Sequence, residues 1–133
     1  AEQEPARQVK IVLPNPTYAD CDPGLMRAAL VNLLSNAWKF TGRVEHPRIQ
    51  FGCFVRGTFP VYFVRDNGAG FDMKHADRMF GAFQRFHREA EFPGTGIGLA
   101  TVKRVIGRHG GQVWAESAPG LGATFYFTLD TPD

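Results

Sequence analysis

The sequence predicts a two-layer α/β (α+β) sandwich, in which helices cover one face of a mixed β-sheet. Two observations support this fold class. Runs of aromatic and β-branched residues, which are typical of strands, lie between segments whose apolar residues recur with the helical period. The chain has 133 residues, 44% hydrophobic and 21% charged, which is the size and composition of one globular domain. We therefore treat residues 1–133 as a single domain whose first eight residues are polar and frayed.

The first two elements have clear boundaries. Residues 9–13 form a short β-like run that ends at a Pro-Asn-Pro turn. Residues 23–41 are expected to form a helix, because their apolar residues recur with the helical period. Asp22 can cap this helix, Pro23 suits its first position and Gly42 can terminate it.

The rest of the chain alternates between strand-like and helix-like segments. A turn that contains Gly57 joins the first strand pair, and Gly110-Gly111 stops the last helix. The predicted elements are strands over residues 48–55 and 59–65, a short helical stretch around residues 73–80, a helix over residues 99–108, and strands over residues 112–116 and 123–129.

Charge and cysteine content exclude several classes of function. The net charge is only +2, which is too balanced for a dedicated nucleic-acid or membrane-surface binder. Cys21 and Cys53 lack the spacing of a zinc site or a disulfide framework, so a reduced, cytoplasmic setting is expected. No apolar run approaches the roughly 20 residues that span a bilayer. The domain should therefore have no direct membrane contact, although its parent protein can be soluble or membrane-anchored.

The first helix carries a stripe of residues whose side chains are able to bind ligands. Four residues at positions i, i+4, i+7 and i+8 share this stripe: Asn32, Asn36, Lys39 and Phe40. The adjoining face carries expected core residues, namely Leu30, Leu33, Leu34 and Ala37. Two mid-helix asparagines are either surface or core-bridging side chains, or they are ligands. An amide oxygen suits Mg²⁺, and a lysine one turn further on can meet a phosphate.

A second motif follows the strand at residues 59–65. Asp66 ends this apolar strand and enters a loop with Gly68 and Gly70. Asp-Asn-Gly is also a hairpin turn signal, but a helical pattern follows it instead of a second alternating strand. A carboxylate at a strand end can accept a hydrogen bond from the amine of a flat ligand, and neighbouring glycines let the backbone approach that ligand closely.

A third motif is a run of alternating glycines, Gly94, Gly96 and Gly98, that leads into a helix. Free backbone N–H groups and the positive end of the helix dipole can bind phosphates there. The spacing matches neither the dinucleotide-binding fingerprint nor the P-loop, and a flexible linker is the alternative interpretation. The polar segment before it can act as a lid, in which Arg85 is able to reach phosphate oxygens.

Taken together and in order, these motifs resemble the ATP-binding catalytic domain of sensor histidine kinases, which has the Bergerat fold. The resemblance covers about residues 9–129, and the sequence of its motifs is most similar to the phytochrome-type and hybrid branch of these kinases. The matching segments are NLLSNAWKFT (32–41), DNGAGFD (66–72), FGAFQRFH (80–87), GTGIGLA (94–100) and GLGATFYFTL (120–129). The resemblance implies a five-stranded sheet with three helices on one face, and ATP and Mg²⁺ as ligands.

The resemblance also implies a role for each matching position. Asn36 would ligate the Mg²⁺ that bridges the phosphates, and Asp66 would accept from the adenine amine. Asn32, Lys39 and Arg85 would take catalytic roles, with Asn32 supporting the metal or its waters and the two cations contacting phosphates. The remaining nucleotide-binding positions would be Phe40, Gly68, Gly70, Gly94, Thr95, Gly96, Ile97, Gly98 and Leu99.

The sequence departs from the family in one minor way and lacks one expected feature. Ala82 stands where many relatives carry proline. In this family the phosphoacceptor histidine sits in a separate helical domain, and none of the four histidines here has its sequence context: His46, His75, His87 and His109. The resemblance therefore implies one part of a two-component kinase. Its partners would be a histidine-bearing helical dimerisation domain and, downstream, a response regulator receiver domain.

Two other functions remain open. The first is a nucleotide-sensing or docking module without phosphotransfer, and the second is a serine kinase of the anti-sigma-factor type on the same fold. Hydrolases of this fold place a glutamate at the position of Asn32 to activate water, whereas an amide cannot act as a general base. We therefore expect negligible ATP hydrolysis by the isolated domain.

Overall fold

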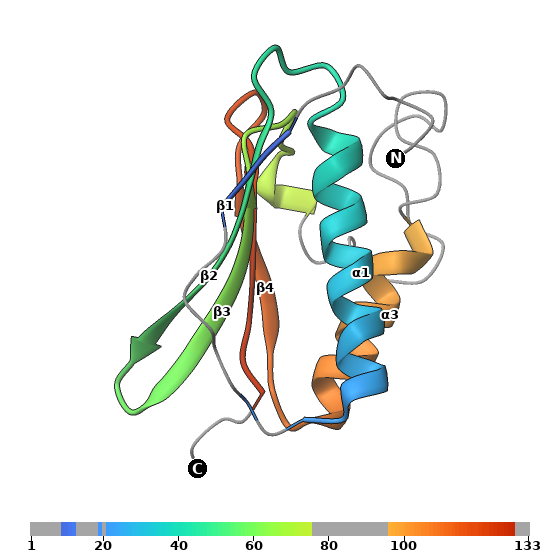
Figure 1. Cartoon of the computed structure of the whole chain (residues 1–133), viewed down its shortest axis with the longest axis vertical. Coiled ribbons are helices and arrows are strands. Elements are labelled where there is room, and N and C mark those ends of the chain that lie inside the picture. Colours follow the sequence, from blue (N-terminus) through green and yellow to red (C-terminus); the bar gives the residue numbers. More distant parts are fainter. Residues whose placement is uncertain (1–8, 13–18, 20, 76–95, 130–133) are drawn as a thin grey trace.

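A computed structural model describes residues 9–12, 19, 21–75 and 96–129, which form a two-layer sandwich (Figure 1). The sheet makes one layer, and two helices that pack against each other make the other. The elements are β1 (Lys10–Val12), α1 (Pro23–Phe40), β2 (Arg48–Arg56), β3 (Phe59–Asp66), a short 3₁₀ helix (Met73–His75), α3 (Gly96–Arg108), β4 (Val113–Ser117) and β5 (Ala123–Phe127).

The sheet is mixed, as the sequence predicts. Its five strands lie in the order β1-β2-β3-β5-β4. β1 pairs with β2 in parallel, and the other three pairings are antiparallel. The last three strands are therefore not in chain order: β5 lies beside β3 in the centre, and β4 forms one edge. This topology places the end of β3 next to the start of β5.

The boundaries of α1 follow the predicted signals. The Asp22 carboxylate accepts a hydrogen bond from the Leu25 amide at 3.0 Å, and Pro23 is the first helical residue. The helix ends at Phe40, one residue before the predicted end, because Thr41 acts as the C-cap. The Thr41 amide and the Thr41 hydroxyl both donate to the Ala37 carbonyl, at 3.1 and 2.8 Å.

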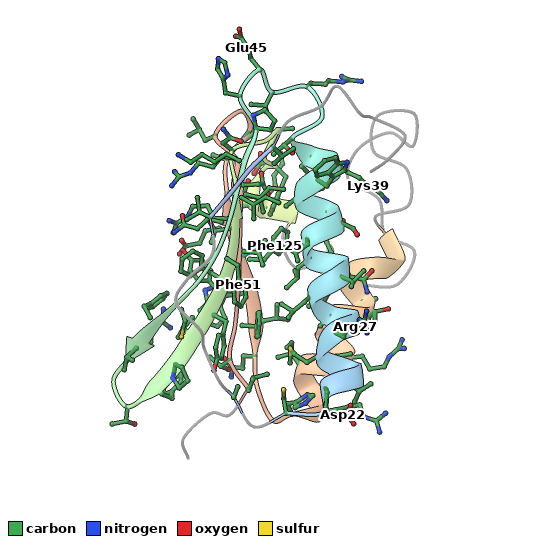
Figure 2. All side chains as sticks on the ribbon, in the orientation of Figure 1. Asp22, Arg27, Lys39, Glu45, Phe51 and Phe125 are labelled. Carbon is green, nitrogen blue, oxygen red and sulfur yellow. The ribbon has the colours of Figure 1, made fainter. Side chains whose placement is uncertain are left out.

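The core lies between the sheet and the two helices, where Figure 2 shows Phe125 facing α1. On α1 the buried stripe comprises Met26, Ala29, Leu33, Asn36, Ala37 and Phe40. Leu34 was expected in this core and is instead 39% exposed. At about 100° per residue it lies off the stripe that Leu33 and Ala37 define. The expectation counted apolar residues and not their angular position.

The second layer differs from expectation at two places. α3 begins at Gly96 and not at Leu99, so it starts three residues earlier than the apolar periodicity predicts. Three helices were expected on this face, whereas the part of the chain that the structure describes holds two α-helices and the 3₁₀ turn at Met73–His75. Residues 76–80 of the predicted short helix lie outside the described residues.

The opposite face of the sheet, here called the outer face, is covered by its own side chains. Trp114 and Tyr126 stack with ring centroids 5.3 Å apart, and Phe63 lies 6.3 Å from Tyr126. Arg56 and Arg65 lie over the rings of Trp114 and Phe63, respectively. Aromatic and cation–π contacts thus shield this face from water without a helix layer.

Candidate functional site

The C-terminal end of α1 packs directly on the loop that follows β3. The Ala69 amide donates to the Phe40 carbonyl at 3.0 Å. A Cβ atom at Gly68 would lie 2.3 Å from that same carbonyl oxygen, so only glycine allows this approach. The asparagine-bearing helix and the Asp-Gly loop, which are 26 residues or more apart in sequence, therefore form one structural unit.

Asp66 is a buried carboxylate in this unit. It lies at the end of β3, is 5% exposed, and accepts the Gly68 amide at 2.8 Å. Burial raises the pKa of Asp66 to about 6, although hydrogen bonds from the Gly68 and Ala123 amides act in the opposite direction. The carboxylate is therefore held in a fixed orientation, and its charged form has lost much of its hydration.

The turn between β4 and β5 also contacts the loop that follows β3, on the side away from α1. The Phe71 amide donates to the Ser117 hydroxyl at 2.9 Å, which in turn donates to the Gly122 carbonyl at 2.6 Å. Gly70 has a φ of +69°, and a Cβ there would meet the Ala118 carbonyl. The sequence analysis did not single out Ser117. Its only signal was the glycine-rich closing turn beside it.

Asn36 supplies the most informative observation. It is 4% exposed, and within the described residues its Nδ2 atom is buried without a hydrogen-bond partner. An orphaned buried amide nitrogen costs about 1–3 kcal/mol. The residue fits the predicted ligand set, because its oxygen suits Mg²⁺ and its nitrogen can donate to a phosphate oxygen.

The other predicted residues of α1 differ in exposure. Asn32 is half-buried and donates its Nδ2 to the Ala28 carbonyl at 2.9 Å, which leaves its oxygen as the atom for a ligand or a water. Lys39 is half-buried one turn beyond Asn36. Phe40 is almost fully buried.

The glycine-rich motif is only partly described. Gly96, Ile97 and Gly98 form the first turn of α3, where backbone N–H groups lack intrahelical acceptors. Leu99 has its side chain in the core, so its contribution to a ligand would come from its backbone. Three other predicted positions lie outside the described residues, namely Arg85, Gly94 and Thr95, and so does Ala82, where many relatives carry proline.

Two histidine side chains can be placed, and they differ in environment. His46 has an exposed side chain beside Glu45 in a loop. His109 joins the two helices: its Nε2 accepts the Asp22 amide at 3.0 Å, and its Nδ1 contacts the Val105 carbonyl at 2.9 Å. These two bonds together require the neutral ring, with the proton on Nδ1.

Two features of the described residues bear on other classes of site. None of the helices in this part of the chain combines the length and apolar character needed to cross a bilayer. In the same residues, no three histidine, cysteine, aspartate or glutamate side chains gather to hold a metal ion.

Comparison with known proteins defines the class. Residues 21–133 match the family described as histidine kinase-, DNA gyrase B- and HSP90-like ATPases, and the chain therefore belongs to that family. Within it, the similar proteins are histidine kinases, which confirms the predicted resemblance.

Two relatives and one solved structure illustrate this. The methanogenesis regulatory histidine kinase FilI of Methanothrix harundinacea is 44% identical over 80% of this chain, and cyanobacterial phytochrome A of Nostoc sp. is 47% identical over 74%. The matches cover 12% and 13% of those proteins, so the chain spans about one eighth of their length. Full-length ShkA, solved in complex with AMPPNP, aligns with a TM-score of 0.72 at 31% identity, over 90% of this chain and 25% of that one.

Proposed function

We propose that this domain binds Mg·ATP on the helical face of the sheet and donates the γ-phosphate to a histidine on a separate helical domain. The observation that carries the proposal is the junction of two polar groups whose burial costs free energy. A buried carboxylate, Asp66, and a buried amide without a partner, Asn36, are held together through the Phe40–Ala69 hydrogen bond. ShkA, a related kinase, was solved with an ATP analogue, which supports nucleotide as the ligand.

The adenine end of the ligand would meet Asp66. As a carboxylate this residue only accepts hydrogen bonds, and the exocyclic amine of adenine donates them. Guanine presents a carbonyl at that position, which the carboxylate repels. Because the Gly68 amide fixes the carboxylate, base selection would need little rearrangement on binding.

The phosphate end would meet the asparagine stripe and the start of α3. Asn36 would hold Mg²⁺ through its amide oxygen, with Asn32 supporting the metal or its waters. Magnesium, when bound, neutralises charge on the triphosphate and orients the γ-phosphate. The chain itself would add Lys39, the backbone N–H groups of Gly96 and Gly98, and Arg85 from the segment that precedes them.

Phosphotransfer would then be a matter of position and electrostatics. A nitrogen of the partner's imidazole forms a bond to the γ-phosphorus as the bond to the bridging oxygen breaks, and ADP leaves with that oxygen. A receiver domain would take the phosphoryl group afterwards. We place this reaction in the cytoplasm, consistent with the free thiols of Cys21 and Cys53.

Two measurements test the proposal. Thermal unfolding with ATP, in the presence and absence of Mg²⁺, should show a metal-dependent stabilisation of about 2.7 kcal/mol at 100 times the dissociation constant. Asn36→Ala should weaken that Mg-dependent binding at least about tenfold with the fold retained, while Ser35→Ala, an exposed neighbour on the same helix, should leave it unchanged. Equal affinity in both variants would refute the metal role of Asn36.

The second measurement separates the kinase from a nucleotide sensor. A histidine-bearing helical domain supplied in trans with γ-labelled ATP should acquire acid-labile label on its histidine. Tight nucleotide binding with no transfer would favour the sensor. Steady hydrolysis approaching about one ATP per second would contradict both the kinase and the sensor interpretation, because the amide of Asn32 cannot activate water.

A further inference from the structure

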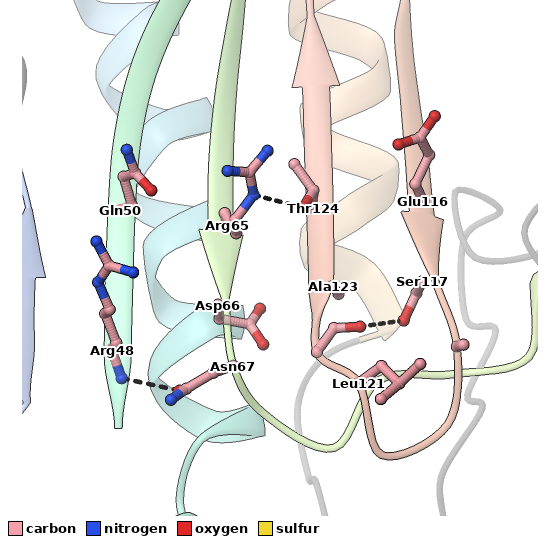
Figure 3. A pocket seen from close by; sticks show the side chains of 12 residues that line it. Arg48, Gln50, Arg65, Asp66, Asn67, Glu116, Ser117, Leu121, Ala123 and Thr124 are labelled. Atoms are coloured by element: carbon pink, nitrogen blue, oxygen red, sulfur yellow. Dashed lines mark hydrogen bonds between the residues drawn. The ribbon is translucent and has the colours of Figure 1, made fainter. Parts of the chain in front are cut away.

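A cleft on the outer face of the sheet borders the proposed nucleotide site, because Asp66 is also among the residues that line this cleft. It has a volume of about 440 Å³ and lies over the ends of β2, β3, β5 and β4 (Figure 3). Gln50, Arg65, Thr124 and Glu116 form one cross-strand row in it. These residues alternate with core residues such as Val64 and Phe125, so their side chains lie on the far side of the sheet from α1 and α3.

One end of this cleft is strongly cationic. Arg48 and Arg65 line it from adjacent strands, and Lys10 of β1 is the register partner of Arg48. Within the described residues, no ion pair involves any of these three cations. The Arg65 guanidinium donates from Nε to the Thr124 hydroxyl at 3.2 Å and lies 4.8 Å from the Phe63 ring, so neutral groups hold it in place.

The other end of the cleft differs in character. Glu116 is the acid in that cross-strand row, and it already accepts the Tyr126 hydroxyl at 3.0 Å. Leu121 lies at the turn beside it and is 80% exposed. The cleft thus presents two arginines, whose guanidinium groups can donate further hydrogen bonds, next to a leucine side chain that is mostly exposed to solvent. Arginine forks match carboxylates in geometry, and desolvated arginine contacts are frequent centres of protein interfaces.

We infer that this cleft binds an acidic segment of another protein or protein domain, with a carboxylate between Arg48 and Arg65 and an apolar neighbour against Leu121. Arg48 and Arg65 outnumber the one carboxyl group at their end of the cleft, the buried Asp66, and the remaining positive charge supplies the complementarity. A single-stranded nucleic acid is the less fitting occupant, because it needs free aromatic faces for base stacking. Here Trp114, Tyr126 and Phe63 already pack on one another. The inference rests on the outer face alone and does not require the proposed kinase activity.

The test uses a defined probe, the acetylated and amidated hexapeptide Glu-Leu-Glu-Glu-Leu-Glu, titrated into the ¹⁵N-labelled domain. We expect saturable shifts at the amides of Gln50, Gly122 and Thr124. The double variant Arg48→Gln/Arg65→Gln should bind at least about tenfold more weakly, as expected for lost charge-assisted bonds. Arg27→Gln, an exposed arginine on α1, is the matched control and should bind as the wild type does.

A second variant guards against an uninformative loss of structure. Glu116→Gln removes a like charge from the cleft and should strengthen binding of the acidic peptide while leaving the spectrum folded. Equal binding of a peptide with lysine in place of glutamate would overturn the inference, as would unchanged affinity in the double variant. Tighter binding of a uridine hexanucleotide at the same amides would also overturn it, in favour of a nucleic-acid site.

Discussion

The two ends of α1 are built on opposite principles. At the N-terminal end, Asp22 caps the helix with its carboxylate and donates its own amide to His109 of the α3 segment. Every polar group named there has a partner. At the C-terminal end, Asn36 keeps an unpartnered amide nitrogen in the interior, and Asp66 keeps a poorly hydrated carboxylate against the helix terminus. One end is satisfied, and the other is not.

This difference separates stability from function within a single helix. A raised pKa of about 6 against an ordinary 3.8 means that Asp66 opposes folding by about 3 kcal/mol once it is ionised. The orphaned amide of Asn36 adds about 1–3 kcal/mol. A domain of this size has only about 5–15 kcal/mol of stability. Such costs are typical of positions where a ligand relieves them, so they support the binding site that we propose at this end of α1.

The largest effect is expected from Gly68→Ala at the unsatisfied end. Its Cβ would lie 2.3 Å from the Phe40 carbonyl, so either the loop or the helix end must move. We expect a loss of about 3 kcal/mol or more in the free energy of unfolding, comparable to severe overpacking. Urea unfolding monitored by circular dichroism measures it.

Gly107→Ala is the matched control for that substitution. Gly107 lies in α3, and an added Cβ would meet nothing within 4 Å. The change should stabilise the protein by roughly 0.5–1 kcal/mol, because alanine is the better helix former. A similar loss in the free energy of unfolding in both variants would mean that the close packing of the loop on α1 does not contribute to stability in particular.

Much of this architecture could be predicted from the sequence, and the reasons are local. The Asp22 cap, the Pro23 start and the alternation in β5 are each encoded within a few residues, and they set α1 and the last strands almost correctly. The exposure of Leu34 and the early start of α3 at Gly96 depend on packing geometry, which apolar periodicity does not resolve.

The site shows the same division. Motif and spacing predict Asn36 and Asp66 as site residues, but nothing in the sequence indicated that the Phe40 carbonyl would join them through Ala69. The role of Ser117 could not be foreseen either, because it depends on contacts with Phe71 and Gly122 made across the fold. Long-range hydrogen bonds of this kind leave no periodic signal in the sequence.

The next effect is the pH dependence introduced by Asp66. Its pKa is higher in the folded state than in the unfolded state, so its favourable contribution is complete below about pH 4 and is lost as the pH rises through 6. Asp66→Asn removes this titration. The variant should match the wild type near pH 4 and exceed it by about 3 kcal/mol at pH 8, as measured by unfolding across that range.

The same variant should lose function where it gains stability. Above pH 6 the wild type should bind ATP in preference to GTP, and Asp66→Asn should reduce that preference because the amide can also donate. Below pH 6 the wild type should itself lose affinity for ATP, as its carboxyl becomes protonated. A base preference that is unaffected by the substitution would show that adenine is read elsewhere.

The smallest effect is expected at the satisfied end of α1. His109→Ala removes the acceptor for the Asp22 amide and the contact with the Val105 carbonyl, at a cost of about 1 kcal/mol for partly exposed hydrogen bonds. His46→Ala should cost almost nothing, since that side chain is exposed. Nucleotide affinity should be unchanged in both variants, because neither residue touches the unit formed by Asn36 and Asp66. ATP affinity should also be compared at a lower temperature, where the loss of stability in His109→Ala no longer matters. A reduced ATP affinity there would mean that the two ends of α1 are energetically coupled and not independent.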